Sequence, residues 1–281
     1  MSLKGNRTHV NALRCFGVLL LAASLAACAA PEPLRPGTPA FGVLGDIPYS
    51  EHEVERLDRL IDEMNAQELA FVVHVGDIGR STLAQACSDD WLEKRKAQFA
   101  RIRHRFILLP GDNEWSDCAR HGIDPLRRLA KWRQLFCLTP REFCEHRRWE
   151  AGGWVFVTLN VPGSNNNRRH AEHGPRMKAV FAELDAAAKL AEQRDGLVIL
   201  LHANPFFYPR LRDGYAELKD RLRALAARMP GKVVLIHGDT HIYRDDEPLP
   251  GLRRIEVWGS PFVGWLRALI QADGLRVDSA R

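Results

Sequence analysis

Apolar runs that are typical of buried strands recur along the chain, and each stops at a polar residue. The runs are rich in Val, Ile, Leu and Phe and are bounded by turn-forming residues, which favours strand over helix. They lie at residues 40–46, 69–77, 105–112, 154–160, 197–202 and 232–241. Two later runs, 253–260 and 263–271, are predicted to be closing strands before an Ala-Asp-Gly turn.

Between these runs, apolar residues recur at the spacing of an amphipathic helix. The stripe within residues 51–69 consists of Val54, Leu57, Ile61 and Met64. Asp124 followed by Pro125 is a typical helix start, because Asp can cap and Pro suits the first helical position. Further helices are predicted at 90–103, from 125 onward, at 175–193 and at 214–229. The alternation of strands and helices predicts an α/β layered domain.

Carboxylate or imidazole side chains lie just past several of the predicted strands. They are Asp46, Asp77, Asp112, His202, Asp239 and His241. A single Asp after a strand is most often a helix cap or a turn former. Independent turns would not choose metal-ligand residue types every time, and ligand sites in open α/β sheets form at the carboxyl ends of strands. The pattern therefore predicts one shared site.

The chemistry of these side chains favours a metal centre. Carboxylates and imidazoles gathered from several strands would repel one another or stay unsatisfied without a cation among them. Mn, Fe, Zn and Mg all accept mixed oxygen and nitrogen ligands. A pair of such metals can clamp the attacking and leaving oxygens of a phosphoryl transfer. Phosphoester hydrolysis is therefore the reaction class to consider first.

Five short motifs carry a resemblance to a known family. In order, they are GDIPY at 45–49, HVGDI at 74–78, PGDNEW at 110–115, LLHANP at 200–205 and HGDTH at 237–241. Together they resemble the five ordered motifs of the calcineurin-like metallophosphoesterases, although each is weak alone. The resemblance implies a four-layer α/β/β/α sandwich and a two-metal site that hydrolyses phosphomonoesters, phosphodiesters or diphosphates.

Position by position, the resemblance also implies ligand roles. Asp46 would bind the first metal, and Asp77 would bridge the two. Asp112 falls where the family usually has a ligand Asn, and His202 would bind the second metal. In the last motif, Asp239 stands at the first histidine of the family's Gly-His-x-His pattern and His241 at the second.

The sequence departs from the family at three motifs. The first motif is usually Asp-x-His, but Pro48 stands at the histidine position. The third is usually Gly-Asn-His, so Asn113 occupies the position of the catalytic histidine; a shift by one residue would instead make Asn113 a ligand and Glu114 the acid. With Asp239 in place of a histidine, the donor set is rich in oxygen. It therefore favours Mn, Fe or Mg over Zn as the two divalent ions.

The polar segment 163–174 is a candidate for contacts to the substrate. Arg168, Arg169 and His173 could meet a phosphate, because the planar fork of a guanidinium matches phosphate geometry. The alternative interpretation is an ordinary solvated loop.

The N-terminal segment is typical of an export signal. Lys4, Arg7 and Arg14 precede an apolar run that is too short for a comfortable membrane span. The run ends at LAAC, residues 25–28, which resembles the lipobox of bacterial lipoproteins, in which the cysteine is lipidated. We therefore expect a signal peptide at 1–27 and a lipid on Cys28.

The resemblance to lipoproteins also predicts the location and layout of the mature protein. Residues 28–40 would form a Pro-rich tether and residues 41–281 the metallophosphoesterase-like domain. Ala29 follows the cysteine, and no Asp is there to suggest retention at the inner membrane. We expect an exported lipoprotein on the periplasmic face, with the outer membrane favoured and the membrane contacted through the lipid.

Net charge gives no case for a nucleic-acid partner. Loss of Lys4, Arg7 and Arg14 with the signal peptide would lower the formal charge from +5 to +2. A chain so weakly basic is not expected to bind nucleic acid specifically. The sequence does not indicate an oligomeric state.

The cysteines of the mature chain predict disulfides. Cys87, Cys118, Cys137 and Cys144 are an even set in an oxidising compartment, and three pairings are open. A short local loop makes Cys137–Cys144 plausible, which leaves Cys87–Cys118. A zinc site is less favoured because none of them forms a CxxC pair.

Two functional hypotheses follow. The first is a membrane-anchored, metal-dependent phosphoric ester hydrolase. The second is a catalytically inactive lipoprotein of the same fold that serves as a binding or structural module. The missing motif histidines favour the second hypothesis, whereas the retained Asp77, His202 and His241 favour the first.

Overall fold

The computed structural model describes residues 39–139, 141–207 and 213–280. The predicted signal peptide, Cys28 and most of the predicted tether lie outside the described residues. Within them, no helix combines the length and the apolar character needed to cross a membrane.

The first sheet has five strands in the order β11-β10-β1-β2-β3. Their bounds are β1 (Ala40–Leu44), β2 (Phe71–His74), β3 (Phe106–Leu108), β10 (Trp265–Gln271) and β11 (Gly274–Ala280). β1, β2 and β3 run parallel, with Val43 opposite Val73 and Val73 opposite Ile107. β10 and β11 join the sheet antiparallel.

The second sheet has six strands in the order β4-β5-β6-β7-β9-β8. Their bounds are β4 (Arg147–Ala151), β5 (Trp154–Thr158), β6 (Gly196–Leu200), β7 (Val233–His237), β8 (Arg244–Leu249) and β9 (Leu252–Glu256). The four inner strands are parallel, and β4 and β8 form antiparallel edges. In both sheets, parallel strands therefore bring their carboxyl ends to one edge.

Helices connect the strands and cover the sheets. The long ones are α1 (Glu51–Asn65), α2 (Asp89–Phe99), α3 (Pro125–Phe136), α5 (His173–Ala191) and α6 (Ala216–Arg228), and α4 (Gly163–Asn166) is a single turn. The helices begin where the local sequence favours a helix start. Asp124 accepts a hydrogen bond from the backbone N–H of Leu126, with Pro125 at the first helical position, as the sequence predicts.

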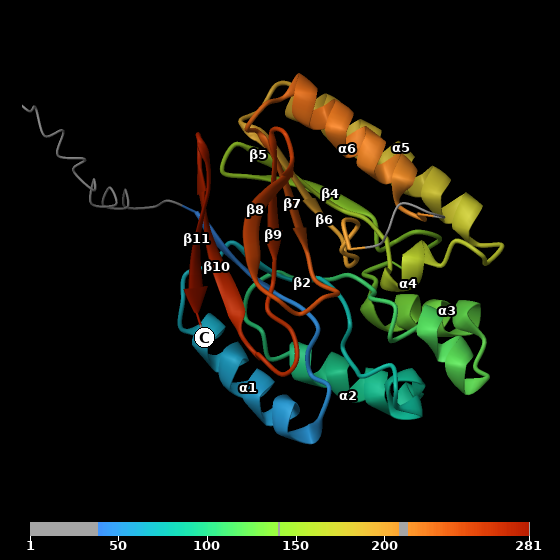
Figure 1. Ribbon diagram of the computed structural model, residues 1–281. Helices are drawn as coiled ribbons and strands as arrows, with labels where there is room; N and C mark the ends of the chain where they lie inside the picture. The colour runs from blue at the N-terminus through green and yellow to red at the C-terminus, as the bar shows by residue number, and fades with distance from the viewer. Residues whose placement is uncertain (1–38, 140, 208–212, 281) are drawn as a thin grey trace, which may run out of the picture. The chain divides into compact units, whose positions relative to one another are not determined.

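Three apolar cores separate four layers. The middle core lies between the sheets and includes Phe41, Val73, Phe156 and Val234. Leu57, Leu92 and Trp132 belong to a core on the outer side of the first sheet, and Leu184 and Leu222 to one on the outer side of the second. Figure 1 shows α1 and α2 on one side of the two sheets and α5 and α6 on the other. The predicted α/β/β/α sandwich is confirmed.

Three strands, β4, β8 and β11, have no counterpart in the sequence prediction. Both β4 and β8 are edge strands, and their sequences, RRWEA and RDDEPL, are dominated by charged residues. Charged side chains on an edge strand oppose unwanted pairing with another chain, but they also remove the apolar signal on which strand prediction depends. The predicted helices are all present, with ends that differ by a few residues.

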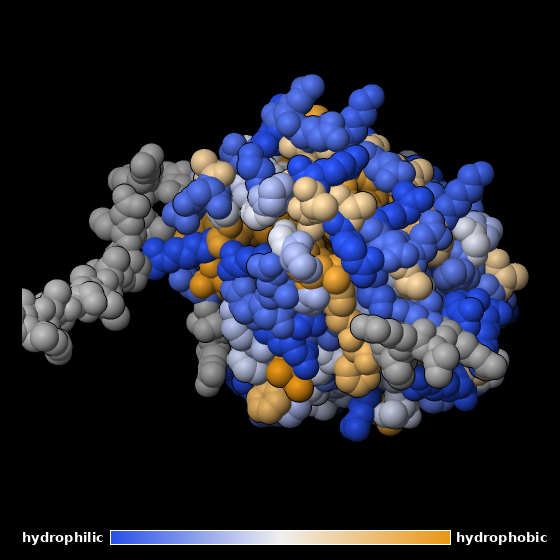
Figure 2. Space-filling model, turned by 45° about the horizontal axis from the view of Figure 1, so that its top comes forward, coloured by the Kyte–Doolittle hydropathy of each residue, from blue (hydrophilic) through white to orange (hydrophobic). Residues whose placement is uncertain are grey.

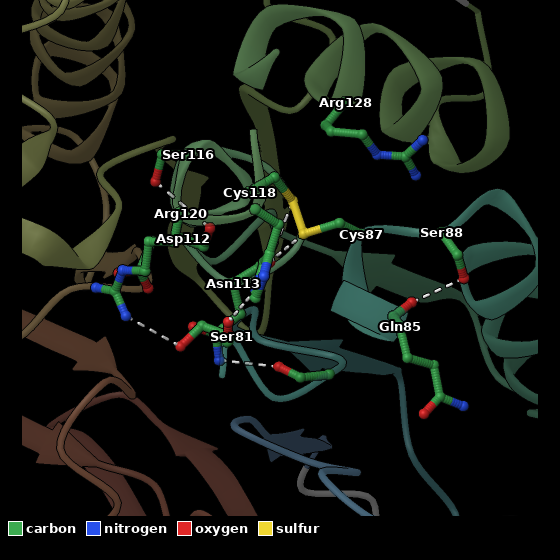
Figure 3. The surroundings of a disulfide bond; sticks show 12 residues. Ser81, Gln85, Cys87, Ser88, Asp112, Asn113, Ser116, Cys118, Arg120 and Arg128 are labelled. Carbon is green, nitrogen blue, oxygen red and sulfur yellow. Dashed lines mark hydrogen bonds between the residues drawn. A yellow bond between two sulfur atoms is a disulfide. The ribbon is translucent and has the colours of Figure 1, made fainter. Parts of the chain in front are cut away.

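Both predicted disulfides are present. Cys87 and Cys118 have Cα atoms 5.8 Å apart and join the segments that follow β2 and β3. Cys137 and Cys144 have Cα atoms 6.0 Å apart and close a short loop after α3. The Cys87–Cys118 bridge contacts the third motif. Both of its sulfurs are 3.6 Å from the backbone oxygen of Asn113 (Figure 3).

Candidate metal centre

The predicted ligands come from both sheets and meet at one edge. Asp46, Asp77 and Asp112 follow β1, β2 and β3 of the first sheet. His202, Asp239 and His241 follow β6 and β7 of the second. The site therefore depends on how the two sheets face each other as well as on where each strand ends.

At this edge, two groups of possible ligand atoms lie close enough to hold a metal ion. One is formed by Asp46, Asp77 and His202, and the other by Asp112, His202 and Asp239; in each group the ligand atoms are within 4.8 Å of one another. His202 belongs to both groups. His241 adjoins the first, with its Nε2 3.6 Å from Oδ1 of Asp46. The structure thus brings together all the residues that the sequence analysis chose as ligands.

Backbone strain is concentrated at this edge. Asp46, Asp77, Asp239 and His241 have φ angles of 55°, 60°, 80° and 63°, in the left-handed region. Non-glycine residues adopt such angles uncommonly, and each costs on the order of 1–3 kcal/mol. Sharp backbone reversals directly after the strands turn these side chains toward one another, so the strain serves the site.

Glycines beside the ligands allow the loops to approach closely. A Cβ atom at Gly111 would overlap the carboxylate of Asp77, and one at Gly238 would overlap that of Asp46. Any larger residue at either position would displace a ligand. Close packing against the carboxylates therefore explains the glycines in the PGDNEW and HGDTH motifs.

Directional hydrogen bonds hold the carboxylates. Oδ1 of Asp77 accepts from the backbone N–H of Asn113 at 3.0 Å. Oδ2 of Asp239 accepts from the backbone N–H of Asn204 at 2.9 Å, while Asp46 accepts from the backbone N–H of Asp239 at 3.0 Å. The ligand oxygens are thus positioned by the backbone of neighbouring loops.

The electrostatics of the cluster favour a bound cation. Burial raises the pKa of Asp46 to about 8 and that of Asp239 to about 7, and it raises the pKa of Asp77 well above its ordinary value. Burial alone would lower the pKa of His202, but the nearby carboxylates, chiefly Asp77, raise it well above the ordinary value. Without metal, protons must neutralise the buried carboxylates. Divalent metals would neutralise them as well, and the donors are of the right type, so the residues fit the predicted cofactor.

The side chains of the third motif differ in their contacts to the cluster. Asp112 lies 3.1 Å from His202 and is part of the cluster. Glu114 is fully buried beside the cluster, and its Oε1 accepts from the backbone N–H groups of Gly111 and Asp77. The geometry therefore agrees with the alignment in which Asp112, and not Asn113, stands at the ligand position.

Asn113 lies beside the cluster with both amide hydrogens engaged. Its Nδ2 donates to the backbone oxygen of Gly79 and to the hydroxyl of Tyr49, each at 2.9 Å. In this structure the Asn113 carboxamide holds Tyr49 in place.

Tyr49 is a site residue that the sequence analysis missed. Its hydroxyl donates to Oδ2 of Asp77 at 2.8 Å and lies 3.3 Å from Nε2 of His241. The phenol thus lies between the predicted bridging carboxylate of Asp77 and the predicted ligand His241. The signal available in the sequence was the GDIPY motif. Tyr49 directly follows Pro48, and Pro48 stands where the family usually has a histidine.

A second missed group surrounds Asp112. The Ser164 hydroxyl hydrogen-bonds Oδ2 of Asp112 at 2.8 Å and Oδ1 of Asp117 at 2.9 Å. Arg120 pairs with Asp117 at 2.8 Å, and its Nη2 lies 3.4 Å from the Ser164 hydroxyl. Its side chain remains 55% exposed, so a guanidinium lies at the rim of the candidate centre (Figure 3).

The turn that carries Ser164 has an unusual backbone. Residues Ser164, Asn165, Asn166 and Asn167 have φ angles of 49°, 57°, 59° and 47°, so four successive residues are left-handed. Asparagine tolerates this region better than most residues because its short polar side chain bonds locally. The asparagine run explains how the turn forms and why Ser164 reaches Asp112.

The predicted substrate contacts lie on the far part of the same segment. Arg168 and Arg169 are exposed on the turn after α4. His173 begins α5, and its Nε2 lies 3.3 Å from the Asn166 amide. Among the described cations near this segment, Arg120 is connected through Ser164 to the cluster.

Known structures resemble this fold, although no sequence match accompanies them. No family model matches the chain, and no curated protein matches it. A dimetal phosphatase from Danio rerio superposes with a TM-score of 0.61 at 15% identity, covering 86% of this chain and 96% of that one. GAP50, described as the anchor in the inner membrane complex of Plasmodium, has a TM-score of 0.59 at 10% identity over 86% and 84% of the two chains.

A third neighbour, the protein TT1561 of Thermus thermophilus, has a TM-score of 0.52 at 8% identity over 87% of this chain and all of that one. Identities this low carry information about the fold alone. The layer order, the sheet topology and these neighbours together establish that the chain has the calcineurin-like metallophosphoesterase fold.

Proposed function

We propose that this protein is a metal-dependent phosphoesterase that hydrolyses phosphomono- or phosphodiester bonds. The observation that carries the proposal is the convergence of four carboxylates, three of them buried, and two imidazoles at the strand ends. The fold is shared with a dimetal phosphatase, which supports the same reaction class.

Each ligand has a proposed role. Asp46 and His241 would hold one divalent ion, Asp112, His202 and Asp239 the other, and Asp77 would bridge them. The oxygen-rich donor set favours Mn, Fe or Mg. When bound, such a pair of ions supplies Lewis acidity toward the phosphoryl group and acidifies water.

The other side chains would orient the ligands and the substrate. Tyr49 donates to Oδ2 of Asp77 and so fixes the rotation of that carboxylate. Asn113 holds the Tyr49 hydroxyl, and a carboxamide has no proton to transfer at ordinary pH. Arg120, at the rim, is placed to hydrogen-bond the non-bridging oxygens of a phosphate. Arg168, Arg169 and His173 are proposed to meet more distant parts of the substrate.

Hydrolysis of bis-p-nitrophenyl phosphate and p-nitrophenyl phosphate, with Mn, Fe, Mg and Zn added singly to metal-free protein, tests the proposal. Asp77→Ala should lose bound metal and several orders of magnitude in turnover, because a bridging carboxylate would contact both ions. Asp90→Ala is the matched control, since Asp90 is an exposed carboxylate on α2. Unchanged metal content and hydrolysis in Asp77→Ala would refute the two-metal mechanism.

A non-catalytic role is the second candidate, and one observation favours it. Pro48 replaces a motif histidine, and the Tyr49 phenol lies between Asp77 and His241. GAP50, which has a similar fold, is described as an anchor. Stoichiometric metal binding without hydrolysis of either nitrophenyl substrate, under all four metals, would favour this role over the enzyme.

We also propose that the protein is a lipoprotein anchored through Cys28, with the outer membrane favoured. The LAAC stretch supports this proposal. Cys28→Ser should block processing or release the protein from membranes, and fractionation with mass spectrometry of the N-terminus measures both. A variant that is cleaved and sediments with membranes like the parent protein would rule out lipidation at Cys28.

A further inference from the structure

An apolar pocket lies on the surface next to the candidate centre. It has a volume of about 530 Å³. Its lining consists of Arg56, Ile242, Trp258, Pro261, Phe262, Val263 and Gly264. Ile242 and Phe262 are 51% and 59% exposed, and because both line the pocket they form a contiguous apolar patch at its surface. On the face drawn in Figure 2, apolar residues lie in small groups among hydrophilic ones.

Aromatic rings form much of the pocket wall. The rings of Trp258 and Phe262 have centroids 5.8 Å apart and planes tilted by 56°. Tyr243 stacks on Trp258 from another side at 5.6 Å. A tilted pair of rings offers both a face and an edge to a third ring, which is the arrangement that aromatic groups prefer.

The pocket wall is joined to the candidate centre by backbone contacts. His241 is the neighbour of Ile242, and Nδ1 of His241 hydrogen-bonds the backbone oxygen of Ser260 at 2.7 Å. The backbone N–H of Ser260 donates to the backbone oxygen of Asp46 at 3.0 Å. The segment that bears Trp258 and Phe262 therefore also supports two predicted ligands of the first metal.

We propose that this pocket binds a planar aromatic group carried by the phosphoester substrate while the phosphate lies at the metal centre. The inference rests on the proposed phosphoesterase function and extends it, because it names aryl phosphoesters as the substrate class. A substrate of this kind would reach from the ligands across His241 to Phe262.

The polar groups that line the pocket are compatible with the binding of an uncharged ring. Arg56 is the charged member of the lining, and its Nη2 donates to the backbone oxygen of Val263 at 3.1 Å. Its guanidinium thus contributes a flat surface as well as a charge. A sugar would need several hydrogen-bonding side chains, and the described lining consists otherwise of apolar residues and glycine.

Binding of two phosphonates to Mn-loaded protein tests the inference without requiring turnover. Phenylphosphonate and methylphosphonate share the phosphonate group and differ in the ring, and calorimetry gives the dissociation constant of each. We expect the parent protein to bind phenylphosphonate at least tenfold more tightly. Phe262→Ala should reduce that preference by about threefold to tenfold through loss of ring contacts, with methylphosphonate binding unchanged. Leu138→Ala, at an apolar residue that is 92% exposed outside the pocket, is the control.

A kinetic arm uses phenyl phosphate and methyl phosphate with the same variants. Equal affinity for the two phosphonates, or an unaltered preference in Phe262→Ala, would overturn the inference. Absence of hydrolysis with a preserved preference for phenylphosphonate would refute the proposed function and leave the pocket assignment standing. Should Phe262→Ala instead change sedimentation behaviour or liposome binding with no effect on phosphonate preference, the pocket is a contact for a second copy or a lipid surface, and the inference is wrong.

Discussion

At the scale of single residues, Asp239 illustrates how one donor of the cluster can influence metal preference. Its carboxylate lies with Asp112 and His202, and burial raises its pKa to about 7. Carboxylate at this position adds a hard oxygen donor where the resembling family has an imidazole. The choice of residue should therefore set which metal is preferred.

Asp239→His should keep metal binding and shift preference from Mn toward Zn, because imidazole is the softer donor. Competition between the two metals, followed by elemental analysis of the dialysed protein, measures the shift. Asp239→Asn is the companion variant, and it should weaken the binding of both Mn and Zn because it removes the negative charge of the carboxylate. An unchanged ratio of Mn to Zn in Asp239→His would mean that Asp239 forms the turn without binding metal.

Arg120 gives a second prediction at this scale. Its guanidinium is paired with Asp117 three residues earlier and lies near Ser164 at the rim of the centre. Arg120→Ala should raise KM for a phosphomonoester about tenfold, the value of a charge-assisted hydrogen bond, with a smaller effect on kcat. Arg223→Ala is matched to it, since Arg223 is equally exposed and also pairs with a carboxylate three residues away. Similar kinetics in the two variants would exclude Arg120 from phosphate binding.

At the scale of elements, the segments after β2 and β3 act as one unit. β2 leads to Asp77 and β3 to Asp112, and the Cys87–Cys118 bridge joins the two segments beyond these residues. The bridge also contacts the backbone oxygen of Asn113, whose N–H binds Asp77. Ligand positions on two different strands are thus linked through one covalent bond.

The two disulfides should differ in their effects on stability and on the site. In the chain-entropy model, loss of Cys87–Cys118, with a separation of 31 residues, costs about 4 kcal/mol, and loss of Cys137–Cys144, with a separation of 7, costs about 2 kcal/mol. Double Cys→Ala variants and urea unfolding give both values. Metal affinity should fall only in the variant that lacks the Cys87–Cys118 bridge. Equal metal affinity in both variants would show that the Cys87–Cys118 bridge does not hold the ligand loops.

At the scale of the whole molecule, buried neutral histidines make folding sensitive to acid. Burial lowers the pKa of His146 to about 4 and those of His74 and His237 to about 3. Unfolding exposes these imidazoles and restores ordinary pKa values near 6.5. Between pH 6.5 and 4 these three imidazoles therefore bind more protons in the unfolded chain, and their contribution to the free energy of unfolding falls as the pH falls.

His146 allows this effect to be measured away from the metal cluster. From its pKa shift, the parent protein should lose about 2 kcal/mol more than His146→Leu between pH 7 and pH 5. Urea unfolding at the two pH values gives the difference, and substitution of the exposed His52 serves as the control. If parent and His146→Leu lose the same stability on acidification, His146 does not titrate as its burial requires.

Much of the architecture and most of the cluster could be predicted from sequence because their signals are local. A buried parallel strand is a short apolar run, and the residue that follows it lies at the carboxyl edge of the sheet. That rule is enough to place Asp46, Asp77 and Asp112 at one edge of the first sheet, whereas His202 joins them because the second sheet packs against the first. The edge strands β4 and β8 lack an apolar run and so could not be found in this way.

The remaining features were decided by the tertiary structure, because they depend on which loops of the two sheets face each other. The layers, the cluster of carboxylates and imidazoles at the strand ends and a favoured disulfide pairing could all be inferred from the sequence. Nothing local indicates that the Tyr49 hydroxyl meets Asp77, that Ser164 reaches Asp112 through a left-handed turn, or that Phe262 and Ile242 line one pocket. Those contacts join residues far apart in the chain, and only the packing of the two sheets brings them into range.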